Sequence, residues 1–137
     1  MPDTLYADVV LPIPVEHPFT YAVPPSLTDR AEIGMRAIVP FNRRTMTGYV
    51  VALKATSDRD DVLPLTDLPD EEPVFRPDMV ELCRWISDYY CCSLGEALQT
   101  AVPAGLSVRT KLRYTLQPDQ LGAGRYTDRQ RAIVAEL

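Results

Sequence analysis

Aromatic side chains occur in two stretches of the chain, one of which also carries two arginines, and this combination is the sequence feature best suited to binding a ligand. The residues concerned are Phe19, Tyr21, Phe41, Arg43, Arg44 and Tyr49. Flat rings stack on nucleic-acid bases, and the planar guanidinium group of arginine donates hydrogen bonds to phosphate oxygens. If the stretches lie side by side, they form a surface for single-stranded nucleic acid. The alternative is that both arginines are simply solvated at a turn.

The stretch 34–53 predicts a β-hairpin that would position most of these residues. Its two apolar runs, 37–39 and 49–53, are rich in β-branched or aromatic residues, which favour strands. The segment 40–48 begins with Pro and ends with Gly, so we expect a loop there, with Arg43 and Arg44 near its tip. The strands would then face a core, and the loop would face a partner.

Two further runs predict strands at residues 6–11 and 19–23, and each is ended by prolines. Four short strands bounded by Pro and Gly indicate a small, Pro-bounded, strongly bent β-sheet or half-open barrel. The acidic segment 56–73 contains several prolines and is predicted to be a surface loop. We expect Leu63, Leu65 and Leu68 to attach this loop to the core.

Two helices are predicted after this loop. Pro77 suits the first turn of a helix, where its missing N–H is not needed. An apolar face follows at helical spacing, made of Met79, Leu82, Cys83, Ile86 and Tyr90. Trp85 and Tyr89 border this face, and we expect them to pack into the core. Ser93 and Glu96 have the spacing of a capping box, which predicts a second, short helix. The predicted fold class is therefore α+β, with two helices packed on the sheet.

The character of the chain changes after Gly105. Residues 108–116 alternate basic or polar side chains with apolar ones, as in a strand, and residues 127–137 have the pattern of a helix. A helix with so little chain left to pack on it indicates the truncated start of a second domain. We therefore expect one domain at 1–105, and a linker with the start of another at 106–137.

The formal net charge of the 137-residue chain is −5, which taken alone argues against a nucleic-acid binder. The distribution matters more, because residues 57–81 carry nine acidic and two basic side chains, whereas residues 106–137 carry six basic and three acidic ones. A basic surface can therefore exist away from the acidic segment. No apolar run approaches the roughly 18 residues of a membrane span, and no secretory signal opens the chain. We expect a cytoplasmic protein without membrane contact.

The sequence lacks the motifs of common catalytic sites. It has no GxxxxGK[ST] phosphate-binding loop and no GxSxG nucleophile elbow. Three cysteines without a CxxC pair and a single histidine, His17, do not predict a zinc site. We expect a binding module without a cofactor. Two alternatives stay open: an independent small enzyme, and a protein-interaction module that docks a partner through the helical face around Trp85 and Tyr89.

The order of these motifs resembles the N-terminal, 3′-end DNA-binding domain of the PriA family (primosomal protein N′) of bacterial replication-restart helicases. The resemblance covers about residues 5–106 in one consistent order. Its segments are 7–14 (ADVVLPIP), 19–21 (FTY), 34–41 (GMRAIVPF), 48–51 (GYVV), 72–74 (EPV), Trp85 with 88–90 (DYY), and 94–98 (LGEAL). The remainder resembles the start of the winged-helix domain that follows in that family.

The resemblance implies a domain that binds stalled replication forks or D-loops and captures the 3′ end of the nascent leading strand. Carried over position by position, the DNA-binding residues are Phe19, Thr20, Tyr21, Phe41 and Asn42, with Arg43 and Arg44 at the same turn. Thr20 stands where the family has Asp, and it can still hydrogen-bond a sugar hydroxyl. Asn42 stands where the family has Gly, and Asn tolerates the left-handed backbone of a turn.

The resemblance also implies the setting of the full-length protein. Its partners would be forked or single-stranded DNA, single-stranded DNA-binding protein and other primosome proteins, at the nucleoid in the cytoplasm. Its ATP-dependent 3′-5′ helicase core would hold ATP and zinc, and that core lies outside this sequence. The chain itself is expected to be non-enzymatic and to bind DNA without a cofactor.

Overall fold

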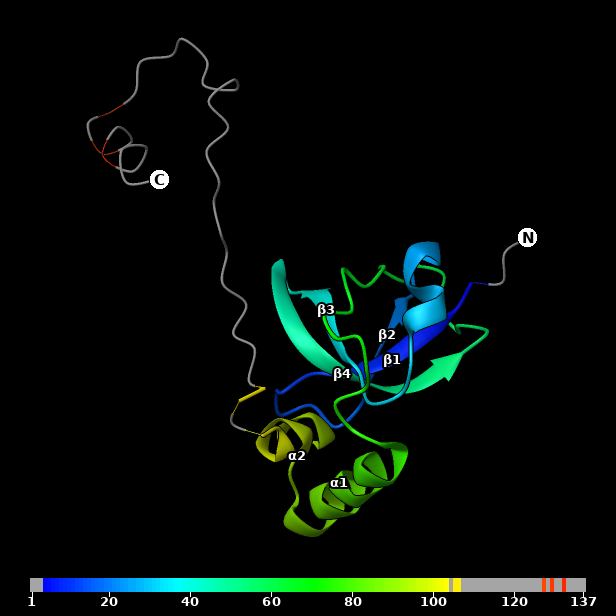
Figure 1. The fold of residues 1–137 in the computed structure, drawn as a ribbon, viewed down its shortest axis with the longest axis vertical. Coiled ribbons are helices and arrows are strands. Elements are labelled where there is room, and N and C mark those ends of the chain that lie inside the picture. Colours follow the sequence, from blue (N-terminus) through cyan, green and yellow to red (C-terminus); the bar gives the residue numbers. More distant parts are fainter. Residues whose placement is uncertain (1–3, 104, 107–126, 128, 130–131, 133–137) are drawn as a thin grey trace.

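The computed structural model describes residues 4–103, 105, 106, 127, 129 and 132. Its elements, in chain order, are β1 (Tyr6–Val10), β2 (Phe19–Ala22), the 3-10 helix η1 (Pro25–Arg30), β3 (Arg36–Phe41), β4 (Arg44–Lys54), α1 (Pro77–Tyr90) and α2 (Leu94–Ala101). The four strands form one antiparallel sheet in the order β2-β1-β4-β3, curled into a half-barrel with both helices on one side (Figure 1).

The predicted α+β fold, with a strongly bent sheet and two helices, is therefore confirmed. The predicted strand at 108–116, most of the predicted helix at 127–137 and the winged-helix continuation lie outside the described residues.

The central hairpin of β3 and β4 is tighter than the sequence indicates, and the predicted loop at 40–48 is wrong. Phe41 pairs with Arg44 in the strand register, so only Asn42 and Arg43 form the turn. Strand β4 begins at Arg44 and not near Tyr49, because the β-branched and long side chains before Gly48 continue the ladder.

Pro40 and Gly48 suggested loop boundaries, but both lie within strands. Pro40 belongs to β3, which is an edge strand, and edge strands tolerate the missing N–H of proline. Gly48 lies where β4 crosses β1 closely, since a Cβ at this position would come within 2.6 Å of the Val10 carbonyl oxygen. The glycine therefore permits close packing of two strands and marks no turn.

The sheet buries both of its faces. Side chains alternate along a strand, so Val9 and Val50 point into the half-barrel, while Val10, Tyr49 and Val51 point toward the helices. The core inside the half-barrel consists of Ala7, Val9, Leu11, Tyr21, Val23, Leu27, Met35, Ala37, Val39, Val50, Leu65 and Leu68. A sheet covered on both sides explains the nearly continuous apolar runs of β1 and β4.

The segment 56–73 is a loop, as predicted, and it runs along the open side of the half-barrel. Leu65 and Leu68 are buried in the inner core, but Leu63 is 58% exposed, so the prediction that three leucines anchor this loop holds for only two of them. Single β-bridges pair Ala22 with Pro64 and Ile38 with Asp67, which attaches the loop to both edge strands.

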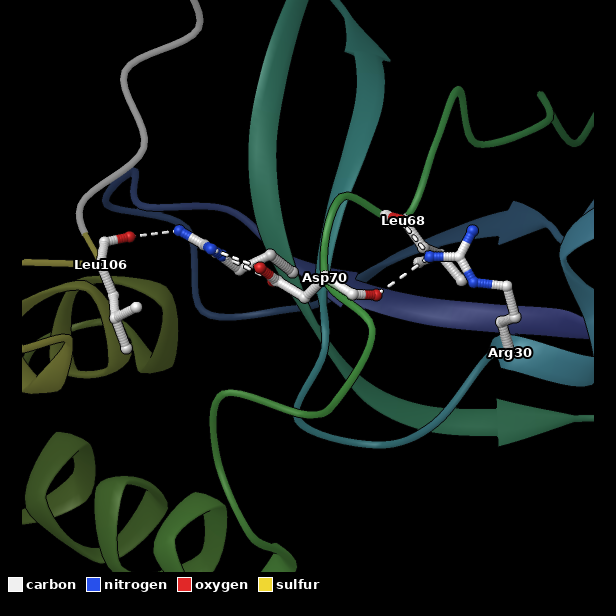
Figure 2. Close-up of polar contacts among 5 residues, drawn as sticks. Arg30, Leu68, Asp70 and Leu106 are labelled. Atoms are coloured by element: carbon white, nitrogen blue, oxygen red, sulfur yellow. Dashed lines mark hydrogen bonds and ion pairs between the residues drawn. The ribbon is translucent and has the colours of Figure 1, made fainter.

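Two arginines, Arg30 of η1 and Arg36 of β3, hold the C-terminal part of this loop in place. The buried Arg36 forms an ion pair with Asp70, with 2.7 Å between Arg36 Nε and Asp70 Oδ2, and donates another hydrogen bond to the Leu106 carbonyl. Arg30 donates to the carbonyl oxygens of Leu68, at 3.0 Å, and of Asp70, at 3.1 Å. Figure 2 shows Asp70 lying between Arg30 on one side and Leu106 on the other.

Helix α1 begins at Pro77 as predicted, but it buries only part of the predicted apolar face, because Cys83 is buried and Ile86 is partly buried against the core. Val80, Cys83 and Ser87 are buried, whereas Met79, Leu82 and Tyr90 of the predicted apolar face are exposed. The spacing is helical in both sets, i, i+3, i+7 for the buried residues and i, i+3, i+11 for the exposed ones, so periodicity alone does not decide which side of the helix meets the sheet.

The aromatic pair on α1 also lies outside the core. Trp85 is 59% exposed and Tyr89 is 67% exposed, so the prediction that they pack into the core is wrong. Their rings stack on each other, with centroids 5.2 Å apart and planes inclined by 19°.

Helix α2 is fixed to the end of β1 through its N-terminus. The predicted capping box is confirmed, because Ser93 Oγ accepts from the Glu96 amide and the Glu96 side chain accepts from the Ser93 amide. Ser93 Oγ also donates to the Ile13 carbonyl at 2.7 Å. This contact holds the proline-containing exit of β1 and so sets the path of the chain into β2.

Candidate nucleic-acid interface

The hairpin turn places two arginines at the outer tip of the sheet. Asn42 has φ 50° and Arg43 has φ 62°, and two positive φ values at the centre of a two-residue turn are the signature of type I′. This turn matches the twist of the strands, and Asn is one of the residues that tolerate it best. Arg43 and Arg44 are both exposed, so their guanidinium groups are accessible to a ligand.

The curl of the sheet brings Phe19 and Phe41 together, although they lie on opposite edge strands. Their ring centroids are 5.0 Å apart with planes at 63°, an edge-to-face arrangement. Beside them the Tyr21 hydroxyl donates to the Pro40 carbonyl at 2.9 Å, which closes the half-barrel at this end. His17 extends the cluster, with its ring centroid 5.2 Å from that of Phe19. Two rings predicted for the site are therefore adjacent and half-buried.

The other two predicted rings are not available for stacking. Tyr21 is 5% exposed, and its burial raises the pKa of its hydroxyl above the usual value. Tyr49 is buried on the helix side of the sheet, where its hydroxyl donates to Gln99 Oε1 at 2.8 Å. The expectation that both tyrosines join an exposed stacking surface is wrong, because the strand alternation turns them into the two cores.

A pocket of about 330 Å³ lies at the outer edge of β2. Its lining consists of His17, Pro18, Phe19, Thr20, Tyr21, Arg59, Asp61, Val62 and Leu63. The loop that forms its far wall is held to β2 by two main-chain hydrogen bonds, from Ala22 N–H to the Leu63 carbonyl at 2.9 Å and from Leu65 N–H to the Ala22 carbonyl at 3.0 Å. Main-chain groups two residues apart on a strand point the same way, so the N–H and C=O of Thr20 also point toward this loop.

Arg59 gives the pocket a cationic group that sequence reasoning missed. Its Nε and Nη2 each donate to the Asp61 carboxylate at 3.1 Å, and this pairing lowers the pKa of Asp61. Guanidinium carries five N–H groups, so those on Nη1 remain for an anionic ligand. The available signal was that Arg59 is the one basic residue in the otherwise acidic stretch 57–72.

A second group that sequence reasoning missed lies behind Thr20. The Thr20 hydroxyl donates to Asp8 Oδ1 at 2.8 Å, and Lys54 Nζ lies 2.6 Å from Asp8 Oδ2. The hydrogen bond to Asp8 raises the pKa of the Lys54 ammonium group. Asp8 and Thr20 are direct partners in the β1–β2 register, so only the strand pairing brings them together.

The predicted site residues thus divide into two groups. Phe19, Thr20 and Tyr21 line the pocket, whereas Asn42, Arg43 and Arg44 form the exposed hairpin tip, and Phe41 contacts Phe19 between them. Among the described residues, no three or more His, Cys, Asp or Glu side chains are grouped so that they could hold a metal ion. No helix in that part of the chain is long and apolar enough to span a membrane.

Comparison with known proteins identifies the family to which the chain is similar. A family model described as the 3′ DNA-binding domain of PriA matches residues 8–103, which include nearly all of the sheet and both helices. Replication restart protein PriA of Bacillus subtilis is 34% identical over 109 residues, covering 76% of this chain and 14% of that protein. The same-named protein of Synechocystis is 32% identical over 121 residues, covering 85% of this chain and 14% of that protein.

Replication restart protein PriA of Chlamydia muridarum aligns over more of the chain, with 27% identity over 139 residues, 97% of this chain and 18% of that protein. The chain therefore spans less than a fifth of the length of these relatives. Because the family model covers well over half of the chain, the chain belongs to the family of 3′ DNA-binding domains of replication restart protein PriA.

Proposed function

We propose that this domain binds the 3′ end of a DNA strand, at stalled replication forks or D-loops where a nascent leading strand ends. The observation that carries the proposal is the pocket at the edge of β2, which combines an aromatic ring, Phe19, with a cationic group, Arg59. Its volume of about 330 Å³ falls in the range of small-ligand pockets, and it is open at the surface. The terminus of a DNA strand fits such a site better than the middle of a strand does, because a pocket encloses a single end group.

In this proposal, different residues of the interface bind different parts of the DNA strand. A terminal base stacks against Phe19 or Phe41, and a phosphate accepts hydrogen bonds from the free donors of Arg59. Arg43 and Arg44 at the hairpin tip then meet phosphates further along the strand. The net charge of −5 is compatible with phosphate binding at the hairpin tip, because the acidic side chains are concentrated in the loop 56–73, which lines the pocket through Asp61, and not at this tip.

A fluorescence anisotropy titration tests the proposal directly. This chain is titrated against a forked DNA whose leading strand ends with its 3′ end at the branch, and against a matched fork without that strand, at two salt concentrations. We expect tighter binding to the fork with the 3′ end, and affinity that falls with salt for both. Binding to neither fork would refute the proposal, and equal binding to both would reduce it to general single-strand binding.

Replacing Arg43 and Arg44 together by alanine is expected to weaken DNA binding. Each lost phosphate contact should reduce the slope of log K against log salt by about 0.7 for single-stranded DNA. The matched control is alanine at Arg76 and Arg84, two exposed arginines that form surface ion pairs with Asp78 and Glu81, Arg76 at the N-cap of α1 and Arg84 within it. An unchanged slope in the hairpin variant, with an intact circular-dichroism spectrum, would contradict the role of the tip.

We further propose that this domain contributes binding and no catalysis. The relatives are more than five times longer than the aligned chain. In this proposal we therefore place ATP hydrolysis, DNA unwinding and zinc binding outside this domain. On this proposal the domain needs no cofactor of its own, and it acts where replication forks are found, at the nucleoid.

A second candidate function is docking of a protein partner, either single-stranded DNA-binding protein or the helicase core of the same protein. The observation that favours it is the exposure of the stacked Trp85 and Tyr89 pair on α1. Tyr90 is exposed beside Tyr89, with ring centroids 4.9 Å apart. Exposed aromatic clusters of this kind mark interaction surfaces, because they offer large apolar area at low entropic cost.

Replacing Trp85 and Tyr89 by alanine is expected to weaken binding of single-stranded DNA-binding protein by at least about tenfold. DNA affinity should stay the same, because neither residue lines the pocket. Isothermal titration calorimetry measures the protein partner and anisotropy the DNA. Met79→Ala, which removes another exposed apolar side chain of α1, serves as the control. Equal partner affinity in the double variant and the native chain would exclude this surface for that partner.

A further inference from the structure

The two arginines of the hairpin tip are positioned differently by the hairpin. Arg44 is the first residue of β4, and it lies directly opposite Phe41, the last residue of β3. Arg43 belongs to the two-residue turn and has φ 62°, so it lies outside the strand alternation. Side chains of directly opposite residues lie on the same face of a sheet, with Cβ atoms about 5 Å apart. Arg44 therefore shares a face with Phe41, whereas Arg43 extends from the turn.

The face shared by Arg44 and Phe41 is the one inside the half-barrel. Phe41 packs against the inner core, and so does Met46, which is two residues after Arg44 on β4. Val50, at the same alternation along β4, is fully buried in that core. Phe19 contacts Phe41 with ring centroids 5.0 Å apart. Of the two tip arginines, Arg44 is thus the one on the face that carries the aromatic pair.

The guanidinium groups of both tip arginines are available to a ligand. Arg43 and Arg44 are exposed, and neither forms an ion pair with any residue that the structure describes. By contrast, the guanidinium groups of Arg30 and Arg36 are occupied by carbonyl and carboxylate oxygens of the fold. The difference between Arg43 and Arg44 is therefore one of position, since their charge and exposure are the same.

We propose that Arg44 binds the phosphate of the last linkage of a DNA strand whose terminal base stacks on Phe19 or Phe41, and that Arg43 meets only phosphates further along the strand. The inference rests on the proposed function, and it assigns one backbone phosphate to one residue. A nucleotide carries its 5′-phosphate close to its own base, so a cation beside the stacking ring meets that phosphate first. The planar fork of arginine suits this contact, because it can donate to two phosphate oxygens at once.

The experiment compares three single-stranded oligonucleotides of one sequence, each titrated against the full chain by fluorescence anisotropy. One has an unmodified backbone, one has an uncharged methylphosphonate at its last linkage, and one has the same methylphosphonate in the middle of the strand. For the native chain we expect the change at the last linkage to weaken binding about three- to tenfold, the effect of one exposed charge-assisted contact. The change in the middle of the strand should weaken binding less.

Arg44→Gln and Arg43→Gln are a matched pair of variants, because each removes one exposed positive charge at the same turn. In Arg44→Gln the unmodified strand should bind about three- to tenfold more weakly than to the native chain. The methylphosphonate at the last linkage should then cause no further loss, because its partner charge is already absent. In Arg43→Gln the native loss at the last linkage should remain. Thermal melts check both folds, and the comparison on the native chain requires no variant.

The result that would overturn the inference is an Arg44→Gln chain that still loses affinity at the modified last linkage, or an Arg43→Gln chain that no longer does. Equal losses for the two modified strands on the native chain would overturn it as well. In each of these cases DNA is still bound, and the proposed function is judged by the separate fork titration. A native chain that binds none of the three oligonucleotides overturns both.

Discussion

Replacing Gly34 by alanine is expected to destabilise the domain by about 2–5 kcal/mol, the sum of a strained backbone and an overpacked contact. Gly34 has φ +91°, a conformation that residues with a side chain rarely adopt. A Cβ at this position would also lie 1.8 Å from the Phe75 carbonyl oxygen. That neighbour is backbone, so the overlap can be relieved only if one of the two chain segments moves.

The position of Gly34 explains why such a movement is costly. Its N–H donates to the Val50 carbonyl at 2.8 Å, and its carbonyl accepts from Val74 N–H at 3.0 Å and Phe75 N–H at 3.2 Å. Gly34 thus joins the start of the central hairpin to the segment that leads into α1. Separating these segments would open the core between the sheet and the helices, in which Phe75 is buried.

Urea denaturation followed by circular dichroism measures the effect of Gly34→Ala. The matched control is Gly105→Ala, since a Cβ there has no neighbouring atom within 4 Å. The control should change the free energy of unfolding by less than about 1 kcal/mol. If both substitutions had equally small effects, the close approach of Gly34 to Phe75 would be refuted.

Replacing Phe19 by leucine is expected to weaken binding of single-stranded DNA by about 1–3 kcal/mol, which is roughly five- to 150-fold in Kd. Phe19 borders the pocket and contacts Phe41, so it is the ring best placed to stack on a terminal base. Leucine retains apolar bulk but has no flat π face. Leucine is chosen over alanine because Phe19 also packs against the inner core, so alanine would change both DNA binding and the stability of the fold.

Anisotropy with a short single-stranded oligonucleotide measures this loss, and a thermal melt checks the fold. Phe19→Tyr is the conservative control, because it retains the ring and should keep the affinity within about threefold. We expect the leucine variant to lose less than about 1.5 kcal/mol of stability, as for other hydrophobic exchanges of similar volume. Native affinity in Phe19→Leu would show that this ring does not stack on DNA.

The first two strands of the sheet were predicted well because prolines that interrupt strand hydrogen bonding mark their ends. The proline after β1 cannot continue a central strand, and two successive prolines end the edge strand β2, so these boundaries agreed with the structure to within a residue. Pro40 and Gly48 are compatible with more than one type of structure. Proline also occurs in edge strands, and glycine also permits close packing, so a two-residue turn was interpreted as a long loop.

The helix α1 shows a different limit. Apolar residues at helical spacing define more than one possible buried face, and α1 carries apolar side chains on several sides. Which face is buried depends on where the sheet and α2 lie, and no property of the helix sequence specifies that. The aromatic pair Trp85 and Tyr89 therefore could not be assigned to core or surface from spacing alone.

Those parts of the candidate site that depend on residues close together in the chain could be predicted. Phe19 and Phe41 could be named because each lies in a recognisable strand, but their contact depends on the curl of the whole sheet. Arg59 lies in the acidic loop, and the contact of Asp8 with Thr20 depends on strand register. Such partners become visible only when the three-dimensional arrangement is known.

The loop 56–73 has two parts with different tolerance for change. Leu65, Leu68 and Asp70 carry its attachment to the fold, whereas Arg59 and Asp61 form only an exposed ion pair at the pocket wall. Residues 57–62 can therefore change in sequence and in length without disturbing the half-barrel, whereas a change at Arg59 would alter the pocket. The same property makes residues 57–62 a suitable segment in which to engineer a preference for other DNA end groups, because such changes leave the attachment of the loop to the fold intact.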